Sequence, residues 1–470
     1  MAKIVFVQRL FHEYPGIEFI SAVLKKGGHQ VDILIGEHPQ KIVKQLHGAD
    51  IVAFSVMTGM QQWALSVAGF IKRYKNILTV FGGPHPTYFP EFINEESVDI
   101  ICRGEGELAL LELADASDKQ SDICNIKNLW IKKDGVIYRN NLRPLVPNLD
   151  DLPFPDRLLY YNKYKFLRND PHKVFLVGRG CPFDCNFCFN ETLKKMYVGL
   201  GCYVRMRGPE NIISEVEMVK RYSPLKTILF SDDIFTFSKI WLKKFTPLYR
   251  RKVNIPFYAA TRADVLDEEV VSLLSEAGCR CVAFAIESGN QKIRNTVLNK
   301  QIANDAIILS AGLLKKYKIK FTTYNMVGIP GETIENIFET IDLNITIGTN
   351  YPRCSLLTPY PGTKIAEYAQ SNGYIDGDPK MISASSQQSE TIIKCDDKDS
   401  VVNLHLFFQT MVLFPWSINV IKRLIKLRPN IFFKAWWMIV YFFVFVRSEG
   451  RSFVNMLIFS LRSWRSFVRK

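Results

Sequence analysis

The 470-residue sequence predicts an α/β protein: a Rossmann-like, doubly wound parallel sheet, then a partial β/α barrel, then a helical C-terminal region. Short β-branched runs alternate with amphipathic segments before residue 116, and the alternation begins again at residue 172. The composition then changes, and the end of the chain is aromatic and basic. We therefore expect domains at 1–145 and 172–385, a linker at 146–171 and a helical region at 386–470.

Five β-branched, apolar runs predict the parallel strands of the first domain. They lie at Lys3–Val7, Gln30–Ile35, Ile51–Ser55, Leu78–Gly82 and Asp99–Arg103. Helical patterns lie between them, for example at Ile17–Lys26 and Gln61–Tyr74, and Lys133-Asp134-Gly135 predicts a hairpin turn. Segment 146–171 is rich in Pro, Asp and aromatic residues without a clear period, which indicates an ordered linker.

The second alternation predicts six further strands, which suits a partial barrel of parallel strands. They are expected at Lys173–Val177, Thr227–Ser231, Pro256–Thr261, Cys281–Glu287, Lys320–Val327 and Cys354–Leu357. Helices are expected between them, for example at Pro209–Arg221 and Asp267–Ala277.

Composition narrows the class of protein. Hydrophobic residues make up 47% and charged residues 23% of the chain, which argues against a disordered chain and against a polytopic membrane protein. The N-terminus, MAKIVFVQRL, resembles a buried strand and not a signal peptide, so we expect a cytoplasmic protein. In that reducing compartment, clustered cysteines indicate metal or redox chemistry.

Three cysteines form such a cluster. Cys181, Cys185 and Cys188 have the spacing C-x3-C-x2-C, in a loop that follows the first strand of the second domain, with the aromatic Phe187 among them. Thiolates suit zinc or an iron–sulfur cluster. A structural zinc site normally needs four protein ligands, whereas three ligands on a four-iron cluster leave one iron open to a substrate or cofactor.

This tri-cysteine loop resembles the hallmark of the radical S-adenosylmethionine (SAM) superfamily. The resemblance implies a [4Fe-4S] cluster whose open iron binds the amino and carboxylate groups of SAM. It also implies SAM contacts after successive strands, at the carboxyl ends where barrel active sites lie. These are Asp232 and Asp233 for the amino group, Arg262 for the carboxylate, Glu287 and Ser288 for the ribose, and Gly328 and Pro330 near the adenine.

The first domain resembles the cobalamin-binding module of class B radical SAM enzymes, by the order of its features. The residues carried over all lie near strand ends, where open α/β sheets bind ligands. They are Tyr14, Gly16, Thr58, Met60, Gln61, Trp63, Gly82, Gly83, His85 and Glu105.

The cobalamin resemblance has a gap, because the cobalt-ligating motif Asp-x-His-x-x-Gly is missing. We therefore expect cobalamin without a histidine ligand from the protein. A Rossmann-like domain that binds another nucleotide, or no corrin, is the alternative. Methylthiotransferases also precede the radical core with an α/β domain, but only Cys102 and Cys124 lie upstream here to bind a second cluster.

The two resemblances together imply a reaction. Reductive cleavage of SAM gives methionine and a 5′-deoxyadenosyl radical, which takes hydrogen from an unactivated substrate carbon, and methylcobalamin then supplies a methyl group. Ring closure or rearrangement, as in tetrapyrrole cyclases, and a non-catalytic corrin-binding or redox module are the alternatives. The expected partners are a small-molecule, lipophilic substrate and an external one-electron donor of the flavodoxin or ferredoxin type.

The net charge of +14 is concentrated at the end of the chain, because residues 422–470 contain eleven Lys or Arg and one acidic residue, Glu449. Ala435–Val446 is an uncharged apolar run, too short for the roughly 20 residues of a spanning helix, and Phe453–Lys470 has apolar residues at helical spacing. One interpretation is two helices on an anionic membrane surface, which would make the protein peripheral on the inner membrane face. The other is helices that cover the barrel; nucleic acid is a weaker third.

Overall fold

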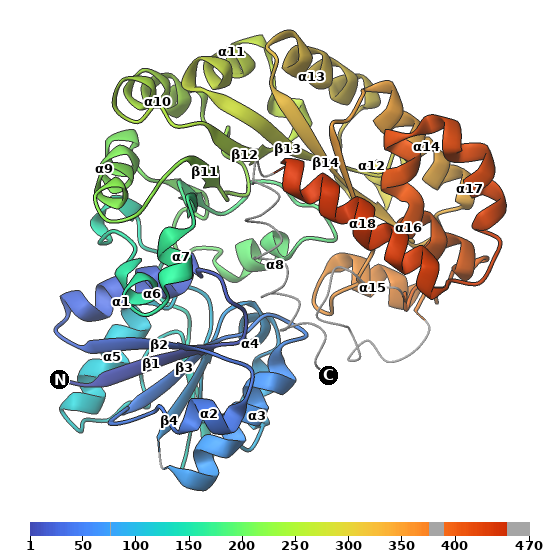
Figure 1. Cartoon of the computed structure of the whole chain (residues 1–470). Helices are drawn as coiled ribbons and strands as arrows, with labels where there is room; N and C mark the ends of the chain where they lie inside the picture. Colours follow the sequence, from blue (N-terminus) through green and yellow to red (C-terminus); the bar gives the residue numbers. More distant parts are fainter. Residues whose placement is uncertain (76, 376–389, 449–470) are drawn as a thin grey trace. The chain divides into compact units, whose positions relative to one another are not determined.

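The computed structural model describes residues 1–75, 77–375 and 390–448 (Figure 1). Within these residues the chain divides into two compact units. Residues 1–170 and 195–205 form unit 1, and residues 171–194 and 206–448 form unit 2. Segment 195–205 lies within the predicted second domain in the sequence, but in the structure it belongs to unit 1.

Unit 1 is the doubly wound sheet that the sequence predicts. Its strand order is β2-β1-β3-β4-β5-β6-β7. The parallel strands are β1 (Lys3–Gln8), β2 (Gln30–Ile35), β3 (Ile51–Ser55), β4 (Leu78–Gly82) and β5 (Ile100–Cys102), followed by the antiparallel β6 (Leu129–Lys133) and β7 (Val136–Arg139). Strand β2 lies on one side of β1 and strand β3 on the other, so the direction of the strand order changes at β1. A ligand crevice is therefore expected beyond the carboxyl ends of β1 and β3.

Helices cover both faces of this sheet (Figure 1). They are α1 (Pro15–Lys26), α2 (Pro39–Val43), α3 (Gln61–Tyr74), α4 (Pro84–Tyr88) and α5 (Glu107–Asp118). Helix α1 packs with α5, whereas α2 packs with α3. The apolar side of α3, formed by Ala64, Val67 and Ile71, is buried against strands β3 and β4.

The segment expected to link the domains is ordered and packs on unit 1. It contains two short helices, α6 (Leu158–Tyr161) and α7 (Lys165–Asn169). Tyr160 is fully buried, and its hydroxyl donates to Oε1 of Gln8 at 2.7 Å. The hydroxyl of Tyr161 donates to Oε2 of Glu13 at 3.0 Å.

Unit 2 contains the partial barrel, a six-stranded parallel sheet of order β15-β14-β13-β12-β11-β8. The strands are β8 (His172–Phe175), β11 (Thr227–Phe230), β12 (Phe257–Thr261), β13 (Cys279–Glu287), β14 (Lys320–Val327) and β15 (Tyr351–Leu356). The intervening helices include α9 (Pro209–Lys220), α10 (Lys239–Lys252), α11 (Glu268–Ala277), α13 (Asn304–Lys316) and α14 (Ile334–Thr346). The strands confirm the predicted positions to within a few residues at each end.

The core of unit 2 lies between this sheet and its helices. Phe230, Phe257, Phe284 and Phe321 are buried in one apolar cluster with side chains of the helices. Sequence signals fix the helix ends: the Asp267 carboxylate accepts from Val270 N at 3.0 Å at the start of α11, and Gly278, with φ of 90°, ends it.

The C-terminal region is helical, as predicted, over its described part. It contains α16 (Lys398–Leu413), α17 (Ile418–Leu424) and α18 (Ile431–Ser448), while Phe453–Lys470 lies outside the described residues. Helix α18 is long and apolar enough to cross a membrane, by length and composition only. It nevertheless packs beside β15 and α16, and Val440 and Val444 lie in a cluster with Cys281 and Tyr351 (Figure 1). One face of α18 therefore covers the barrel.

Candidate active site

The tri-cysteine loop is held in place by main-chain hydrogen bonds to the loop after helix α12 (Gln291–Thr296) and to the start of helix α15 (Lys364–Ser371). Asn186 N donates to Leu298 O at 3.0 Å, and Ile365 N donates to Asn186 O at 2.9 Å. The side chain of Asn186 donates to Val297 O at 2.9 Å. The loop position between the second and third cysteines is therefore fixed by the fold, which preorganises the thiols.

The three thiols are half-buried neighbours. Burial raises the pKa of Cys181 to about 11, and the negative charges of Asp233, Cys188 and Cys185 add to this effect. In the described part of the chain, no three His, Cys, Asp or Glu side chains are close enough to share a single metal ion. Each thiolate of a four-iron cluster binds a different iron, so this donor set fits a cluster better than zinc.

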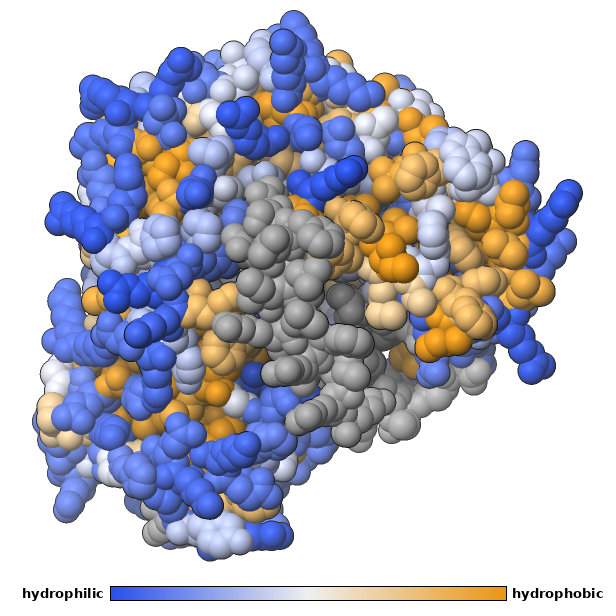
Figure 2. All heavy atoms as spheres, viewed as in Figure 1, coloured by the Kyte–Doolittle hydropathy of each residue, from blue (hydrophilic) through white to orange (hydrophobic). Residues whose placement is uncertain are grey.

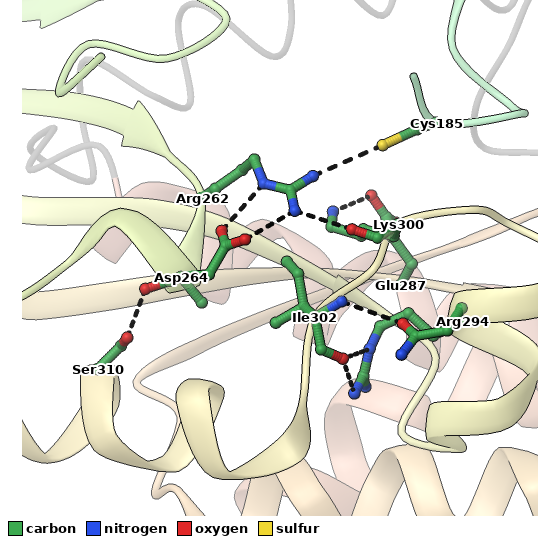
Figure 3. A network of polar contacts seen from close by, with 10 residues as sticks. Cys185, Arg262, Asp264, Glu287, Arg294, Lys300, Ile302 and Ser310 are labelled. Atoms are coloured by element: carbon green, nitrogen blue, oxygen red, sulfur yellow. Dashed lines mark hydrogen bonds and ion pairs between the residues drawn. The ribbon is translucent and has the colours of Figure 1, made fainter. Parts of the chain in front are cut away.

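Two cations face Cys185 (Figure 3). Nη1 of Arg262 lies 3.8 Å from the Cys185 sulfur. Burial raises the pKa of Cys185, and the positive charges of Lys300 and Arg262 act against this rise. Both side chains are buried. They favour the thiolate form, which is the form that binds iron.

Most of the hydrogen bonds of Arg262 are donated to protein atoms of unit 2. Its Nε and Nη2 donate to the two carboxylate oxygens of Asp264 at 3.0 and 2.8 Å, and Nη2 also donates to Lys300 O at 2.8 Å. The guanidinium carbon lies 3.6 Å from the centroid of the Phe183 ring. Arg262 therefore contacts the cysteine loop through Nη1 at Cys185 and through its guanidinium face at Phe183. Its contact with a SAM carboxylate stays a prediction.

Glu287 and Ser288 lie at the carboxyl end of β13, where the register with β14 shifts. Glu287 has a φ of 67°, which is uncommon for a residue with a side chain and indicates a constrained site. Its Oε1 accepts from Nζ of Lys300 at 3.1 Å. The hydroxyl of Ser288 is buried and has no hydrogen-bond partner among the described residues, as expected of a group positioned for a ligand.

The carbonyl of Ser288 is fixed by a buried arginine. Nη1 of Arg294 donates to Ser288 O at 2.7 Å. Its Nε and Nη2 donate to Ile302 O at 3.0 and 2.7 Å (Figure 3). Arg294 is fully buried. Lys300, Asp264 and Arg294 were not among the residues predicted from the sequence.

Asp232 follows β11, and its two carboxylate oxygens have different environments. Its Oδ1 accepts from Val177 N at 2.8 Å and Gly178 N at 2.6 Å, whereas Oδ2 is buried and has no hydrogen-bond partner in the described part of the chain. Burial raises the pKa of Asp232 to about 7, and the two backbone donors act against this rise. Asp233 has a different environment, because its charge acts on Cys181 and Cys188.

The glycine-rich turn after β14 is held by Glu332. Its Oε2 accepts from Gly328 N at 2.8 Å and Ile329 N at 3.2 Å, and its Oε1 is buried without a partner. Gly328 has a φ of 75°, which favours glycine, and Pro330 is buried. Burial raises the pKa of Glu332 to about 8.

In unit 1, His85 and Thr58 come together at the carboxyl ends of β3 and β4. Thr58 Oγ1 lies 3.2 Å from Nδ1 of His85. The ring of His85 packs against those of Phe89 and Phe92, at 5.0 Å between centroids in each case. Burial lowers the pKa of His85 to about 4, so this imidazole is neutral at physiological pH.

Gly83 is needed by the protein backbone itself. It has a φ of 91°, and a Cβ there would lie 3.0 Å from Val56 N and 3.1 Å from Val56 O. At Gly82 a Cβ would make only ordinary contacts, the nearest at 3.7 Å to Cys102. The contact of both glycines with cobalamin, which the family resemblance implies, stays a prediction.

Glu105 lies in an ion pair that the sequence did not predict. Arg205 donates from Nη2 to Oε1 at 2.7 Å and from Nη1 to Oε2 at 3.2 Å. In the same segment, Tyr197 accepts from Glu105 N at 3.1 Å, and its ring lies against Gly104. Segment 195–205 therefore packs on the end of β5.

The other cobalamin candidates lie near the starts of α1 and α3. Tyr14 is the N-cap residue of α1, and Gly16 is exposed in its first turn. Met60 is the N-cap residue of α3, and the Gln61 side chain accepts from Gly59 N. Trp63 packs partly against the core, and its Nε1 donates to Glu37 O at 3.0 Å.

Comparison with known proteins agrees with both units. Residues 175–343 match the family model of the Radical SAM superfamily, and residues 3–114 match that of the B12 binding domain. An uncharacterized methyltransferase of Pyrococcus horikoshii is 31% identical over 372 residues, covering 77% of this chain and 79% of the relative. An anaerobic magnesium-protoporphyrin IX monomethyl ester cyclase of Rubrivivax gelatinosus is 25% identical and covers 73% of this chain, which spans 64% of that relative.

Among solved structures, the cobalamin-dependent S-adenosylmethionine radical enzyme OxsB, with aqua-cobalamin and S-adenosylmethionine bound, has a similar fold. The TM-score is 0.72 at 15% sequence identity, covering 99% of this chain and 79% of OxsB. The predicted fold class is thereby confirmed. Because family models match both of its units and the archaeal relative is similar over most of both chains, this chain belongs to the cobalamin-dependent radical SAM enzymes.

Proposed function

We propose that this enzyme is a C-methyltransferase that acts on an unactivated carbon of a small-molecule substrate. The observation that carries the proposal is the 31% identical methyltransferase relative, which aligns across most of both chains. When bound, the cluster supplies the electron that cleaves SAM, and the cobalamin carries the methyl group. An external one-electron donor of the flavodoxin or ferredoxin type would reduce the cluster.

Different residues of unit 2 would bind the cluster and SAM. Cys181, Cys185 and Cys188 would hold the cluster, and Lys300 and Arg262 would keep Cys185 as a thiolate. The unpartnered oxygen of Asp232 is an acceptor for an ammonium group, as in the predicted contact with the SAM amino group.

Two turns would provide the contacts to the parts of SAM that lie farther from the cysteines. The buried Ser288 hydroxyl would donate to or accept from the ribose, since no described residue forms a hydrogen bond with it. The turn at Gly328–Pro330, fixed by Glu332, would contact the adenine.

In unit 1 the cobalamin would lie beyond the carboxyl ends of the strands. The His85 ring is held by Thr58 and two aromatic rings, and we assign it to the wall of the cobalamin site. The absence of the cobalt-ligating motif from the sequence agrees with this assignment.

Ring closure is the second candidate reaction, because cyclase relatives share 25% identity with this chain. A methyl-labelled SAM distinguishes the two without knowledge of the substrate. We would incubate the reconstituted enzyme anaerobically with SAM that carries a deuterated methyl group, and extract the cobalamin for mass spectrometry. Labelled methylcobalamin is expected; formation of 5′-deoxyadenosine without labelled methylcobalamin would favour ring closure. Enzyme reconstituted without cobalamin is the control.

We also propose that the protein is cytoplasmic and docks on an anionic membrane through its C-terminal helices. Large apolar side chains on η5 (Pro415–Ser417), α17 and α18 are exposed; Trp416 is 80% and Phe432 79% accessible. We call this surface the docking face. It consists of Trp416, Val420, Leu427, Ile431, Phe432, Trp436, Met438, Ile439 and Phe443.

The charge of this region favours a lipid surface as the partner. Residues 400–448 contain six Lys or Arg and no Asp or Glu. On α18, Phe432, Trp436, Ile439 and Phe443 recur at helical spacing, so they form one exposed apolar stripe. Figure 2 shows hydrophobic side chains gathered on the side of unit 2 where these helices lie. Apolar and aromatic residues beside Lys and Arg are typical of interfacial helices.

A further inference from the structure

The concave side of the barrel sheet in unit 2 contains a cavity. Residues of all six strands line it, together with Ser448, the last residue of α18. Its walls are mostly apolar or small, and include Val174, Leu229, Ala260 and Ala283. The cavity volume is about 180 Å³, and a cavity of about 150 Å³ can hold one benzene ring.

Arg353 lies in the wall of this cavity, and its guanidinium contacts one hydroxyl and two aromatic rings. Its Nη2 donates to Ser448 Oγ at 2.7 Å, while Nε is buried and has no hydrogen-bond partner. The guanidinium carbon lies 4.7 Å from the Phe445 ring centroid and 5.8 Å from that of Tyr324. Arg353 is partly exposed, and among the described residues no Asp or Glu forms an ion pair with it, so an anionic ligand would supply a countercharge.

The same cavity reaches the carboxyl end of strand β11. Asp232 also lines it, and the unpartnered Oδ2 of Asp232 lies at the carboxyl end of β11. Asp233, the next residue, acts electrostatically on Cys181 and Cys188. A molecule in the cavity would therefore extend from Arg353 toward the loop of the cysteines.

We propose that the cavity is the substrate site and that Arg353 binds an anionic group of the substrate, a carboxylate or a phosphate. This inference rests on the proposed function, because it presumes a substrate that enters the barrel. The guanidinium presents its donors in a planar fork that matches both anions. The aromatic rings of Tyr324 and Phe445 hold the plane of the fork, which reduces the entropy lost on binding.

The test measures binding of three probes to the full-length reconstituted enzyme by ligand-observed NMR: benzoate, phenyl phosphate and benzamide. The first two separate carboxylate from phosphate recognition, and benzamide is the neutral comparison. We expect at least one anion to bind more tightly than benzamide. In Arg353→Gln, its affinity should fall by about tenfold or more, with benzamide unchanged. Arg353→Lys should retain part of the affinity.

The control variant is Arg280→Gln, which removes an exposed arginine from β13 of the same sheet and should leave all affinities unchanged. Equal anion binding by wild type and Arg353→Gln, or no preference of the wild type for either anion, would overturn the inference. Substrate-free formation of 5′-deoxyadenosine from SAM is measured in parallel. If wild type forms it and the anion preference is absent, only the Arg353 assignment fails; if wild type does not form it, the proposed function fails.

Discussion

The ammonium of Lys300 lies 3.1 Å from a carboxylate oxygen of Glu287, and this buried pair stands beside Cys185. Glu287 adopts a left-handed backbone at a register shift in the sheet. The lysine belongs to the loop after a short helix, α12 (Gln291–Thr296), and its own carbonyl accepts from Arg262. Lys300 therefore contacts both Glu287 and Arg262, the residues predicted to contact the ribose and the carboxylate of SAM, and it lies near the cluster ligand Cys185.

Replacing Lys300 by Gln is expected to have two effects. The carboxylate of Glu287 loses its buried partner, so the free energy of unfolding should fall by about 3 kcal/mol. A cation is also removed from beside Cys185, so the cluster should become harder to reduce. Chemical denaturation and a redox titration followed by EPR measure the two effects.

The double variant Lys300→Met with Glu287→Leu provides the control. It leaves no unpaired buried charge, so it should lose less stability than Lys300→Gln alone. If both proteins lose the same stability, the ion pair does not account for the effect.

The raised pKa of Glu332 predicts a pH-dependent stability. The folded protein holds the proton up to about pH 8, whereas the unfolded chain releases it near the ordinary pKa of glutamate. Between these values the folded state binds more protons, so the free energy of unfolding should fall, by a few kcal/mol, as pH rises.

Glu332→Gln keeps an acceptor for Gly328 N and removes the titration, so it should flatten this part of the profile. Glu335→Gln, which removes an exposed carboxylate in the first turn of the following helix α14, is the matched variant. Urea denaturation at several pH values gives both profiles. Parallel profiles for wild type and Glu332→Gln would contradict the assignment.

Gly104 is expected to tolerate no side chain. A Cβ would collide with the Tyr197 hydroxyl and lie 2.9 Å from the ring carbon that bears it. Gly104→Ala should therefore destabilise unit 1 by more than the ~1–2 kcal/mol that a left-handed backbone alone costs. Gly199→Ala has a similar φ of 77° with nothing within 4 Å, so it measures the backbone cost alone. Equal melting temperatures for the two variants would show that segment 195–205 is not packed on Gly104.

The docking face predicts binding to anionic vesicles. Wild type should sediment with phosphatidylglycerol vesicles and remain in the supernatant with phosphatidylcholine. Phe432→Glu and Trp416→Glu should weaken sedimentation, because each places a charge where an apolar side chain would enter the lipid.

Lys426→Glu should weaken sedimentation further at low salt, since each basic residue contributes ~1 kcal/mol near an anionic surface. Ile240→Glu changes an equally exposed apolar residue, 72% accessible on α10, and should have no effect. Sedimentation that these variants do not alter would remove the docking face from the account.

The elements that the sequence predicted correctly are those whose residue pattern lies within one short stretch of the chain. Strands Gln30–Ile35, Ile51–Ser55 and Lys320–Val327 have the predicted bounds, because buried parallel strands are continuous apolar or β-branched runs. The cysteine loop was found for the same reason, since its three ligands lie within eight residues of sequence.

The residues that the sequence did not reveal act over long separations. Lys300 and Arg294 follow no strand end and belong to no motif; only their burial identifies them. Segment 195–205 crosses to unit 1, and its one local signal is the pair Gly199 and Gly201, both with positive φ. The orphaned Nε of Arg353 depends on the placement of α18, which no strand pattern encodes.

The most direct test of the central claim is anaerobic incubation of the reconstituted protein with SAM and dithionite, followed by quantification of 5′-deoxyadenosine. Wild type should form 5′-deoxyadenosine, and Cys181→Ala should form none, because one of the three cluster ligands is missing. Cys202→Ala, which removes an exposed cysteine outside the loop, should behave as wild type. Undiminished formation by Cys181→Ala, or none by wild type with its cluster intact, would contradict the account.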